Sequence, residues 1–224
     1  RLPTRYGIEP SAVILSAEES SGTEQQEAPS SSPSSSEVTY RIRDCQYREL
    51  TNVATLVVES FYDKRKVNLV ARKLYQLAEM NRLQQNFPYP ESRSVHRMLV
   101  IEASPQEGDD EPTIVGFCDV DARPCATKLK LPRPYLSDLA VDPIHRRKGL
   151  AKMIVEASEE FVQSDKVGDG APFDELWIRV AADNEAALGL YRDKLGYSFA
   201  DWSTGEETTG DGAEIFTLRK DFGK

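Results

Sequence analysis

The sequence is poor in the residues that build metal centres and disulfide frameworks. Its three cysteines, Cys45, Cys118 and Cys125, are odd in number and lack CxxC spacing, and the chain holds only two histidines. This usage predicts reduced thiols in an intracellular compartment and gives no sign of a metal site. The sequence also lacks an N-x-[ST] sequon and any apolar run of the roughly 18 residues that a membrane helix needs. A disulfide-stabilised secreted domain and a membrane-spanning protein are therefore not expected.

An excess of basic charge is also missing. The 224 residues carry a formal net charge of −9, and the pI is about 4.9. A nucleic-acid binder needs a basic face toward the phosphate backbone, so neither nucleic acid nor a membrane is an expected partner. An acidic surface suits a cationic partner or substrate, although it also serves solubility.

The first 37 residues differ in composition from the rest. Between Ser16 and Ser36 there are nine serines, two prolines and four glutamates. We expect residues 1–37 to be a disordered acidic serine-rich segment, followed by one folded domain over 38–224. A transit peptide would be poor in acids, whereas this segment has two arginines and six glutamates. Because the chain starts with arginine, we expect a trimmed precursor in an intracellular compartment, with the chloroplast one candidate after removal of a transit peptide.

Hydrophobic periodicity predicts the elements of the folded domain. Alternation predicts strands, and three- and four-residue spacing predicts helices. The predicted strands are 38–43, 98–103, 113–121, 136–141, 175–181, 197–202 and 214–219, and the predicted helices are about 47–61, 64–85, 149–161 and 184–195. The second helix is expected to bury one apolar stripe and to expose its charged face to water. That stripe comprises Val67, Val70, Ala71, Leu74, Leu77 and Ala78.

The stretch Tyr135–Lys152, YLSDLAVDPIHRRKGLAK, combines three elements in a short span. An apolar strand ends at Asp142-Pro143, since proline removes a strand donor. A basic turn follows and leads through Gly149 into an amphipathic helix. Unpaired amides, the positive end of the helix dipole and cationic side chains then meet at one point, where a phosphate or pyrophosphate satisfies all three. The spacing matches neither GxxxxGK[ST] nor GxGxxG, so a hydrolysing P-loop and a dinucleotide site are not indicated.

A second stretch, DNEAALGLYRDKLGY, has the pattern of a short capped helix. Asn184 is a suitable N-cap, Ala187 and Tyr191 share one apolar face, and Gly196 ends the helix.

Together the two stretches resemble the hallmarks of the GCN5-related N-acetyltransferase (GNAT) superfamily. Arg146-x-x-Gly149-x-Ala151 is similar to its Q/R-x-x-G-x-G/A acyl-CoA motif, and the segment from Asn184 to Tyr197 is similar to its N-x-x-A-x-x-L-Y-x-x-x-G-F/Y motif. The resemblance covers about residues 38–220 and is closest to RimI-like and plant plastid members. It implies a mixed α/β (α+β) fold with a central sheet of about seven strands, splayed fourth and fifth strands, and four helices.

The resemblance also implies how acetyl-CoA binds as co-substrate. Pantetheine would enter the gap between the splayed strands and pair, like an added strand, with the backbone of Leu139 and Val141. The pyrophosphate would rest on amides of the basic turn, where a side chain at Gly149 would block close approach. Asn184 would hydrogen-bond the pantetheine arm, or would act only as an N-cap. The implied cofactor-binding residues are Leu139, Ala140, Val141, Arg146, Arg147, Lys148, Gly149, Leu150, Ala151, Lys152, Asn184 and Ala187.

Catalytic roles are implied for fewer residues. A backbone N–H between Leu139 and Val141 would meet the acetyl carbonyl oxygen, and Tyr191 would protonate the CoA sulfur unless it only packs. Several RimI-like relatives carry a glutamate five residues before the motif asparagine, and that position is Arg179 here. The candidate substitutes for this base are Asp138, Glu175 and an ordered water.

The missing base bears on the choice of acceptor. At pH 8 a lysine of pKa 10.4 is deprotonated to about one part in 250, a penalty of about 3 kcal/mol, whereas an α-amine of pKa near 8 has almost none. The expected activity is therefore acetyl-CoA-dependent N-acetylation of protein N-terminal amines, with lysine ε-amines as further acceptors. Two alternatives stay open: an acetyltransferase for small amines such as arylalkylamines or polyamines, and an inactive acyl-CoA-binding module.

Overall fold

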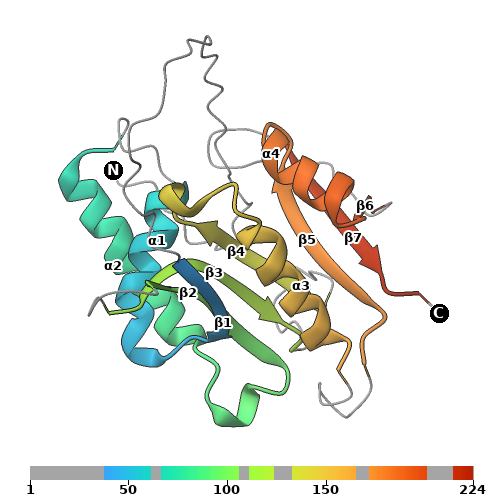
Figure 1. Cartoon of the computed structure of the whole chain (residues 1–224), viewed down its shortest axis with the longest axis horizontal. Helices are drawn as coiled ribbons and strands as arrows, with labels where there is room; N and C mark the ends of the chain where they lie inside the picture. Colours follow the sequence, from blue (N-terminus) through green and yellow to red (C-terminus); the bar gives the residue numbers. More distant parts are fainter. Residues whose placement is uncertain are drawn as a thin grey trace, which may run out of the picture.

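The computed structural model describes residues 38–61, 67–105, 111–123, 133–164, 172–200 and 214–223. These residues form a seven-stranded mixed sheet with helices on both faces (Figure 1). The strands are β1 (Val38–Asp44), β2 (His96–Pro105), β3 (Thr113–Asp121), β4 (Tyr135–Val141), β5 (Glu175–Ala181), β6 (Ser198–Phe199) and β7 (Ile215–Asp221). The helices are α1 (Leu50–Phe61), α2 (Leu69–Asn86), α3 (Leu150–Val162) and α4 (Glu185–Leu188), which continues as a π-helical turn over Gly189–Lys194. Short 3-10 turns lie at Tyr47–Glu49, Pro90–Ser92 and Pro143–His145.

The predicted order of elements and the α/β fold class are confirmed. The second helix starts later than predicted, because Asn68 caps it by accepting a hydrogen bond from the Ala71 N–H at 2.8 Å. The predictions for residues 1–37, Cys125 and the end of strand 197–202 fall outside the described residues.

The sheet separates two apolar cores. On one face, α3 packs Ile154 and Val155 against strand residues such as Leu139 and Ile178. On the other face, α1 and the C-terminal part of α2 pack against Phe117 and its neighbours. Buried Cys118 lies within the first core, as a small residue should, and its Sγ is 3.4 Å from the Ser158 hydroxyl.

The one parallel pair of the described sheet, β4 with β5, is short. It comprises only the pairs Tyr135 with Trp177 and Leu136 with Ile178, after which the two strands separate toward their C-terminal ends (Figure 1). On either side the ladders are antiparallel, in the order β1-β2-β3-β4 and β5-β7-β6. The splayed fourth and fifth strands predicted from the sequence are therefore present.

The predicted burial of the α2 stripe is wrong. Val70, Leu74 and Leu77 are 70%, 50% and 57% exposed, and Ala78 is also exposed. Periodicity locates the apolar side of a helix, but it does not say whether another element covers that side. The one buried residue that α2 contributes in the described structure is Leu83, on another side of the helix. Of the predicted stripe, only Val67 and Ala71 are half-buried.

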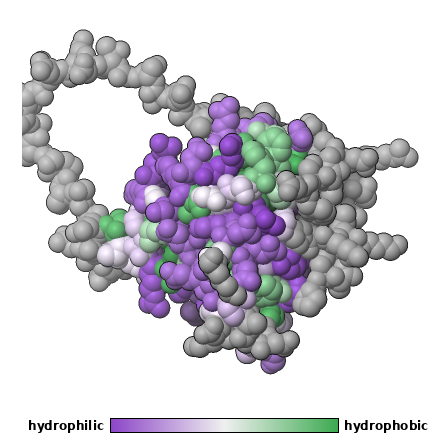
Figure 2. Space-filling view, turned by 90° about the vertical axis from the view of Figure 1, so that its right-hand side faces the viewer, coloured by the Kyte–Doolittle hydropathy of each residue, from purple (hydrophilic) through white to green (hydrophobic). Residues whose placement is uncertain are grey.

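No helix in the described ranges combines the length and the apolar character that crossing a bilayer requires. Figure 2 shows the side of the molecule that lies on the right of Figure 1, where β5, β6 and β7 are found. Its described atoms are mostly hydrophilic, and the hydrophobic areas among them are small and separate.

Candidate active site

Strand β4 is interrupted by a bulge next to the splay. In its ladder with β3, Ala140 pairs with Phe117 and Ser137 pairs with Asp119, so β4 has one residue more than β3 between these two pairs. Asp138, within the extra stretch, has a left-handed φ of 56°. A bulge leaves one residue out of the ladder and bends its strand. Strand β4 therefore offers backbone groups outside the regular ladder close to the point where β5 departs.

The turn after β4 is built to present backbone amides. Asp142 starts it by accepting a hydrogen bond from the Ile144 N–H at 2.9 Å. Arg147 and Gly149 both have left-handed backbones, with φ of 63° and 80°, and Gly149 is the N-cap of α3. Left-handed residues near a helix start turn successive N–H groups toward one concave site that suits an anion. A Cβ added at Gly149 would meet no atom within 4 Å, so the space beside this turn is open.

The cations of the turn have different roles. Arg147 and Lys148 are exposed, and Lys152 is 49% exposed with Glu156 at 3.4 Å. Arg146 instead points back to the sheet, where its Nε donates to the Val141 carbonyl oxygen at 2.9 Å. Partial burial lowers the pKa of Arg146 below its ordinary value. Of the four cations, Arg146 thus holds the end of the strand, while Arg147, Lys148 and Lys152 stay accessible.

Tyr40 on β1 is a member of the site that the sequence reasoning missed. Its hydroxyl accepts a hydrogen bond from Lys148 Nζ at 2.9 Å and lies 3.0 Å from His145 Nδ1. The hydroxyl thus contacts two residues of the basic turn at once. The contact fixes the basic turn to the edge strand. Nothing in the local sequence indicated it, since it joins residues more than 100 positions apart.

Tyr191 lies on the π-helical turn, with its whole side chain buried. Such wide turns are frequent at functional sites. The ring packs edge-on against Tyr197 at 5.6 Å between centroids. Among the described residues the Tyr191 hydroxyl has no hydrogen-bond partner, and burial raises its pKa well above the ordinary value. The side chain is therefore a protonated donor without an acceptor in the part of the chain that the structure describes.

Asn184 acts as the N-cap of α4 and retains a further donor. Its Oδ1 accepts from the Ala187 N–H at 3.1 Å, which confirms the capping role. The side chain is buried, and in the described part of the chain its Nδ2 has no partner. Ala187 itself is fully buried in the core. The Nδ2 donor is thus left without a partner in the described structure, at the start of α4 and just after β5.

The candidate bases differ in position. Asp138 is fully buried, and its Oδ2 accepts from Arg82 Nη2 at 2.7 Å. Burial raises the pKa of Asp138 to about 6, against the opposing effect of Arg82. Glu175 begins β5 before the pair of Trp177 with Tyr135, at the end of the sheet away from the basic turn. Arg179, at the position where the family resemblance led us to look for a glutamate, is buried on β5.

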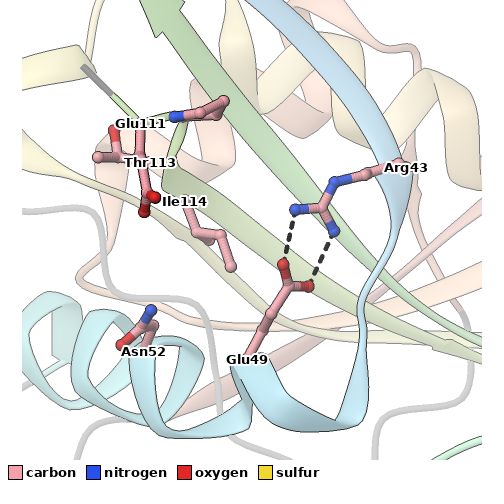
Figure 3. Close-up of a pocket in the computed structure, with 7 residues that line it drawn as sticks. Arg43, Glu49, Asn52, Glu111, Thr113 and Ile114 are labelled. Carbon is pink, nitrogen blue, oxygen red and sulfur yellow. Dashed lines mark hydrogen bonds and ion pairs between the residues drawn. The ribbon is translucent and has the colours of Figure 1, made fainter. Parts of the chain in front are cut away.

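Two cavities lie beside α1, on the other side of the sheet from α3. The larger, of about 420 Å³, is lined by Asn52, Thr113 and Ile114 and bordered by the ion pair of Arg43 with Glu49 (Figure 3). Glu111 also lines it. The smaller, of about 180 Å³, shares Asn52 and Ile114 and extends to Asp142 at the end of β4. None of the sequence-predicted site residues lines either cavity, and carboxylates are prominent in both linings: Glu49, Glu111, Glu59 and Asp142.

The residues present fit acetyl-CoA. The open space beside left-handed Gly149 suits a phosphate, exposed Arg147 and Lys148 supply positive charge, and the buried Asn184 Nδ2 supplies an unused donor beside the gap. For a metal ion, the described ranges hold no group of three or more His, Cys, Asp or Glu side chains with suitable placement.

Comparison with known proteins agrees with this geometry. The profile of the acetyltransferase (GNAT) family matches residues 74–197, more than half of the chain. The chain therefore belongs to the acetyltransferase (GNAT) family. The family consists of acyltransferases that use acetyl-CoA as the donor, which is the enzyme class and the co-substrate expected from the two motifs.

Individual relatives are more distant. Over 88 residues the chain is 32% identical to the [ribosomal protein bS18]-alanine N-acetyltransferase of Escherichia coli, a match that spans 39% of this chain and 55% of that protein. The chain thus spans about half the length of the curated relatives it matches. Among solved structures, a GNAT-family acetyltransferase from Streptococcus pneumoniae is similar with a TM-score of 0.52 at 16% identity, over 83% of this chain and 100% of that one. A chimera of the spermidine N-acetyltransferase from Vibrio cholerae has a TM-score of 0.50 at 14% identity, over 82% of this chain and 95% of that one. These two likenesses show the fold alone.

Proposed function

We propose that this chain is an acetyl-CoA-dependent N-acetyltransferase that acts on protein N-terminal α-amines, with lysine ε-amines as further acceptors. The observation that carries the proposal is the continuity of the bulged β4 with the open turn at Gly149. One short segment thus presents backbone donors for a thioester and, directly after it, an anion site for a diphosphate. The sequence similarity to the E. coli ribosomal protein acetyltransferase supports a protein acceptor.

When bound, acetyl-CoA would supply the activated acetyl thioester. Amides of the turn from Arg147 to Ala151 would hold the diphosphate, with Lys148 and Lys152 nearby. A backbone N–H of the β4 bulge would donate to the acetyl carbonyl oxygen, where negative charge grows during the reaction. Asn184 Nδ2 would donate to the pantetheine arm, which would lie along the part of β4 that does not pair with β5.

Tyr191 would hold the proton that the leaving sulfur needs. A thiol is ordinarily a stronger acid than a phenol, by about 1.5 pKa units, so full proton transfer to a thiolate in water is uphill by about 2 kcal/mol. In a dry site the charge on either group is disfavoured, since burial penalises thiolate and phenolate alike. The buried hydroxyl of Tyr191 has no acceptor among the described residues, which supports a donor role toward the sulfur in such a site.

The acceptor amine would need little help to lose its proton if it is an α-amine. Asp138 is tied to Arg82, Glu175 lies at the far end of β5, and position 179 is arginine, so a strong and accessible base is missing from the described candidates. An α-amine of pKa near 8 is partly neutral at physiological pH, whereas lysine is almost fully charged. The site therefore favours the α-amine.

One observation favours a second candidate, a polyamine acceptor. Glu59 and Asp142 line the smaller cavity beside α1, and Glu111 lines the larger one, where Glu49 is already paired with Arg43. The carboxylates of Glu59, Glu111 and Asp142 would attract a multiply charged amine.

A competition assay separates these functions. The full chain is incubated with acetyl-CoA and equal concentrations of a lysine-free peptide with a free N-terminus, an N-terminally blocked peptide with one lysine, and spermidine. We expect kcat/KM at pH 7.5 to be at least tenfold higher for the free N-terminus, measured by mass spectrometry of the products. A preference for spermidine would contradict the proposal. Binding of acetyl-CoA by calorimetry without any product would indicate an inactive binding module.

Tyr191→Phe tests the acid role in the same assay. Because the general acid contributes about 10² to 10⁴ in rate, we expect kcat to fall at least a hundredfold while the protein stays folded. Tyr197→Phe is the matched control, since its ring packs against that of Tyr191, and we expect it to retain kcat within about threefold. Undiminished turnover by Tyr191→Phe at pH 7 would show that the acid is another group.

A further inference from the structure

Arg82 connects α2 to the bulge of β4. Its Nη2 donates to Asp138 Oδ2 at 2.7 Å, and its Nε donates to Glu79 Oε2 at 3.1 Å, one turn back on the same helix. The arginine side chain is 16% exposed, and that of Asp138 is fully buried. The interaction is therefore a well-covered bridge from a helix to the middle of the sheet.

Asp138 needs such a bridge because its backbone is unfavourable. A φ of 56° brings the Cβ of an L-residue close to its own backbone, and residues other than glycine adopt it only where the surroundings hold them. Contacts within β4 add little, since Ser137 Oγ donates to Asp138 Oδ2 only at 3.4 Å. The strong partner of the carboxylate is Arg82.

The helix needs the bridge as well. Its apolar side, with Val70, Leu74 and Leu77, is exposed, and its one buried residue in the described structure is Leu83. Leu83 directly follows Arg82 in sequence. Leu83 and the partly buried Met80 join the core that α1 shares with the sheet, and Arg82 beside them adds an ion pair to β4. These contacts together fix the C-terminal half of α2.

We propose that Arg82 is a positioning residue for acetyl transfer: by holding the Asp138 carboxylate it keeps the β4 bulge in shape and so aims the backbone N–H groups beside it at the acetyl carbonyl. The proposal rests on the proposed function. It gives Asp138 the role of an anchor for the bulge, in place of the general base considered from the sequence. It also makes the geometry of the donor site depend on how α2 is seated.

The chemistry of arginine suits this role. Its planar guanidinium makes separate hydrogen bonds to Glu79 and Asp138 at the same time, whereas a lysine ammonium on a flexible stem does not hold the same fork. We therefore expect Arg82→Lys to restore only part of what Arg82→Gln loses.

The first test compares Arg82→Gln with Arg72→Gln, which removes a cation from the same helix where Arg72 lies 3.9 Å from Glu59. A misplacement of about 1 Å at a catalytic centre can lower a rate about a hundredfold. We expect kcat of Arg82→Gln to fall thirtyfold or more, whereas kcat of Arg72→Gln falls by no more than about threefold. The Kd for acetyl-CoA should stay within about threefold of the wild-type value in both variants. An Arg82→Gln protein that is folded and retains kcat would overturn the proposal.

The pH profile distinguishes an anchor from a base. The charged groups that act on Asp138 are Arg82 and Glu79 of α2 and Asp119 of β3. Removing Arg82 raises the pKa of Asp138. If Asp138 were the general base, it would be protonated at pH 7 in the Arg82→Gln protein, and kcat would recover at pH 9. If Asp138 is an anchor for the bulge, the loss of kcat persists at pH 9. Recovery to the wild-type rate at pH 9 would overturn the positioning role.

Hydrogen exchange keeps the proposal independent of the acceptor. In Arg82→Gln we expect amide exchange over residues 135–141 to become at least tenfold faster, with the Arg72→Gln protein unchanged. If the wild-type chain acetylates no amine, the proposed function fails, and exchange still decides whether Arg82 holds the bulge. Unchanged exchange over 135–141 would overturn the inference even in an active enzyme.

Discussion

At the scale of single residues, Gly149 and Gly196 form a natural pair for comparison. Both have left-handed backbones, with φ of 80° and 76°, and an added Cβ at either would meet no atom within 4 Å. Alanine therefore brings the same backbone penalty at both positions, about 1–2 kcal/mol. Only Gly149 lies in the turn that we assign to the diphosphate.

We predict that Gly149→Ala and Gly196→Ala lower the free energy of unfolding by similar amounts, about 1–2 kcal/mol each in urea titrations. Only Gly149→Ala should also raise the Kd for acetyl-CoA, by at least tenfold in calorimetry, since a methyl group beside the turn keeps the phosphate away from the amides. Equal Kd values for the two variants would place the diphosphate elsewhere.

At the scale of elements, α2 shows how far sequence patterns reach. Its existence and approximate length follow from the spacing of its apolar residues, and the same pattern assigned it the wrong buried side. The residues that fix it, Arg82 and Leu83, carry no pattern of their own: Asp138 lies 56 positions from Arg82, and the core around Leu83 is gathered from α1, β2, β3 and β4. Tyr40 was missed for the same reason.

Unlike the seating of α2, the two motifs could be located from the sequence, because each is local. The turn at Gly149 and the cap at Asn184 depend on neighbours within a few residues, so sequence spacing is enough to predict them. The proposed oxyanion donor depends on a bulge, and a bulge is visible only when the register of β4 against β3 is known. Asp138 was accordingly considered for its carboxylate and not for its backbone.

We predict that Leu83→Ala and Leu74→Ala differ strongly in stability although both shorten a leucine of α2. Leu83 is fully buried, so its truncation should cost about 2–5 kcal/mol. Leu74 is 50% exposed, and its truncation should change the unfolding free energy by no more than about 0.5 kcal/mol. Urea unfolding monitored by circular dichroism measures both. A large loss for Leu74→Ala would mean that its side chain is covered in solution.

At the scale of the whole molecule, buried thiols limit stability at alkaline pH. Burial raises the pKa of Cys45 and of Cys118 to about 12, from an ordinary value of 9.0. Between these values the unfolded chain releases protons that the folded chain keeps, so the unfolding free energy falls as pH rises. The loss is up to about 1.4 kcal/mol per pH unit for each thiol.

We therefore predict that the urea midpoint stays nearly constant from pH 7 to 8.5 and falls steeply between pH 9 and 11. Cys118→Ala should make the fall shallower, although it lowers stability at pH 7 by leaving a small void. A midpoint that is flat to pH 11 would show that the thiols are accessible in the native state.

The brief junction between β4 and β5 has a consequence for the life of the protein in a cell. Two pairs of residues join the two antiparallel blocks within the sheet, and pantetheine lying against β4 would extend that joint. Ligand that binds only the native form adds about 2.7 kcal/mol when present at a hundred times its Kd. The resistance of the protein to heat and proteolysis would then rise and fall with the cellular concentration of acetyl-CoA. A cell that runs short of acetyl-CoA would therefore also lose the enzyme itself.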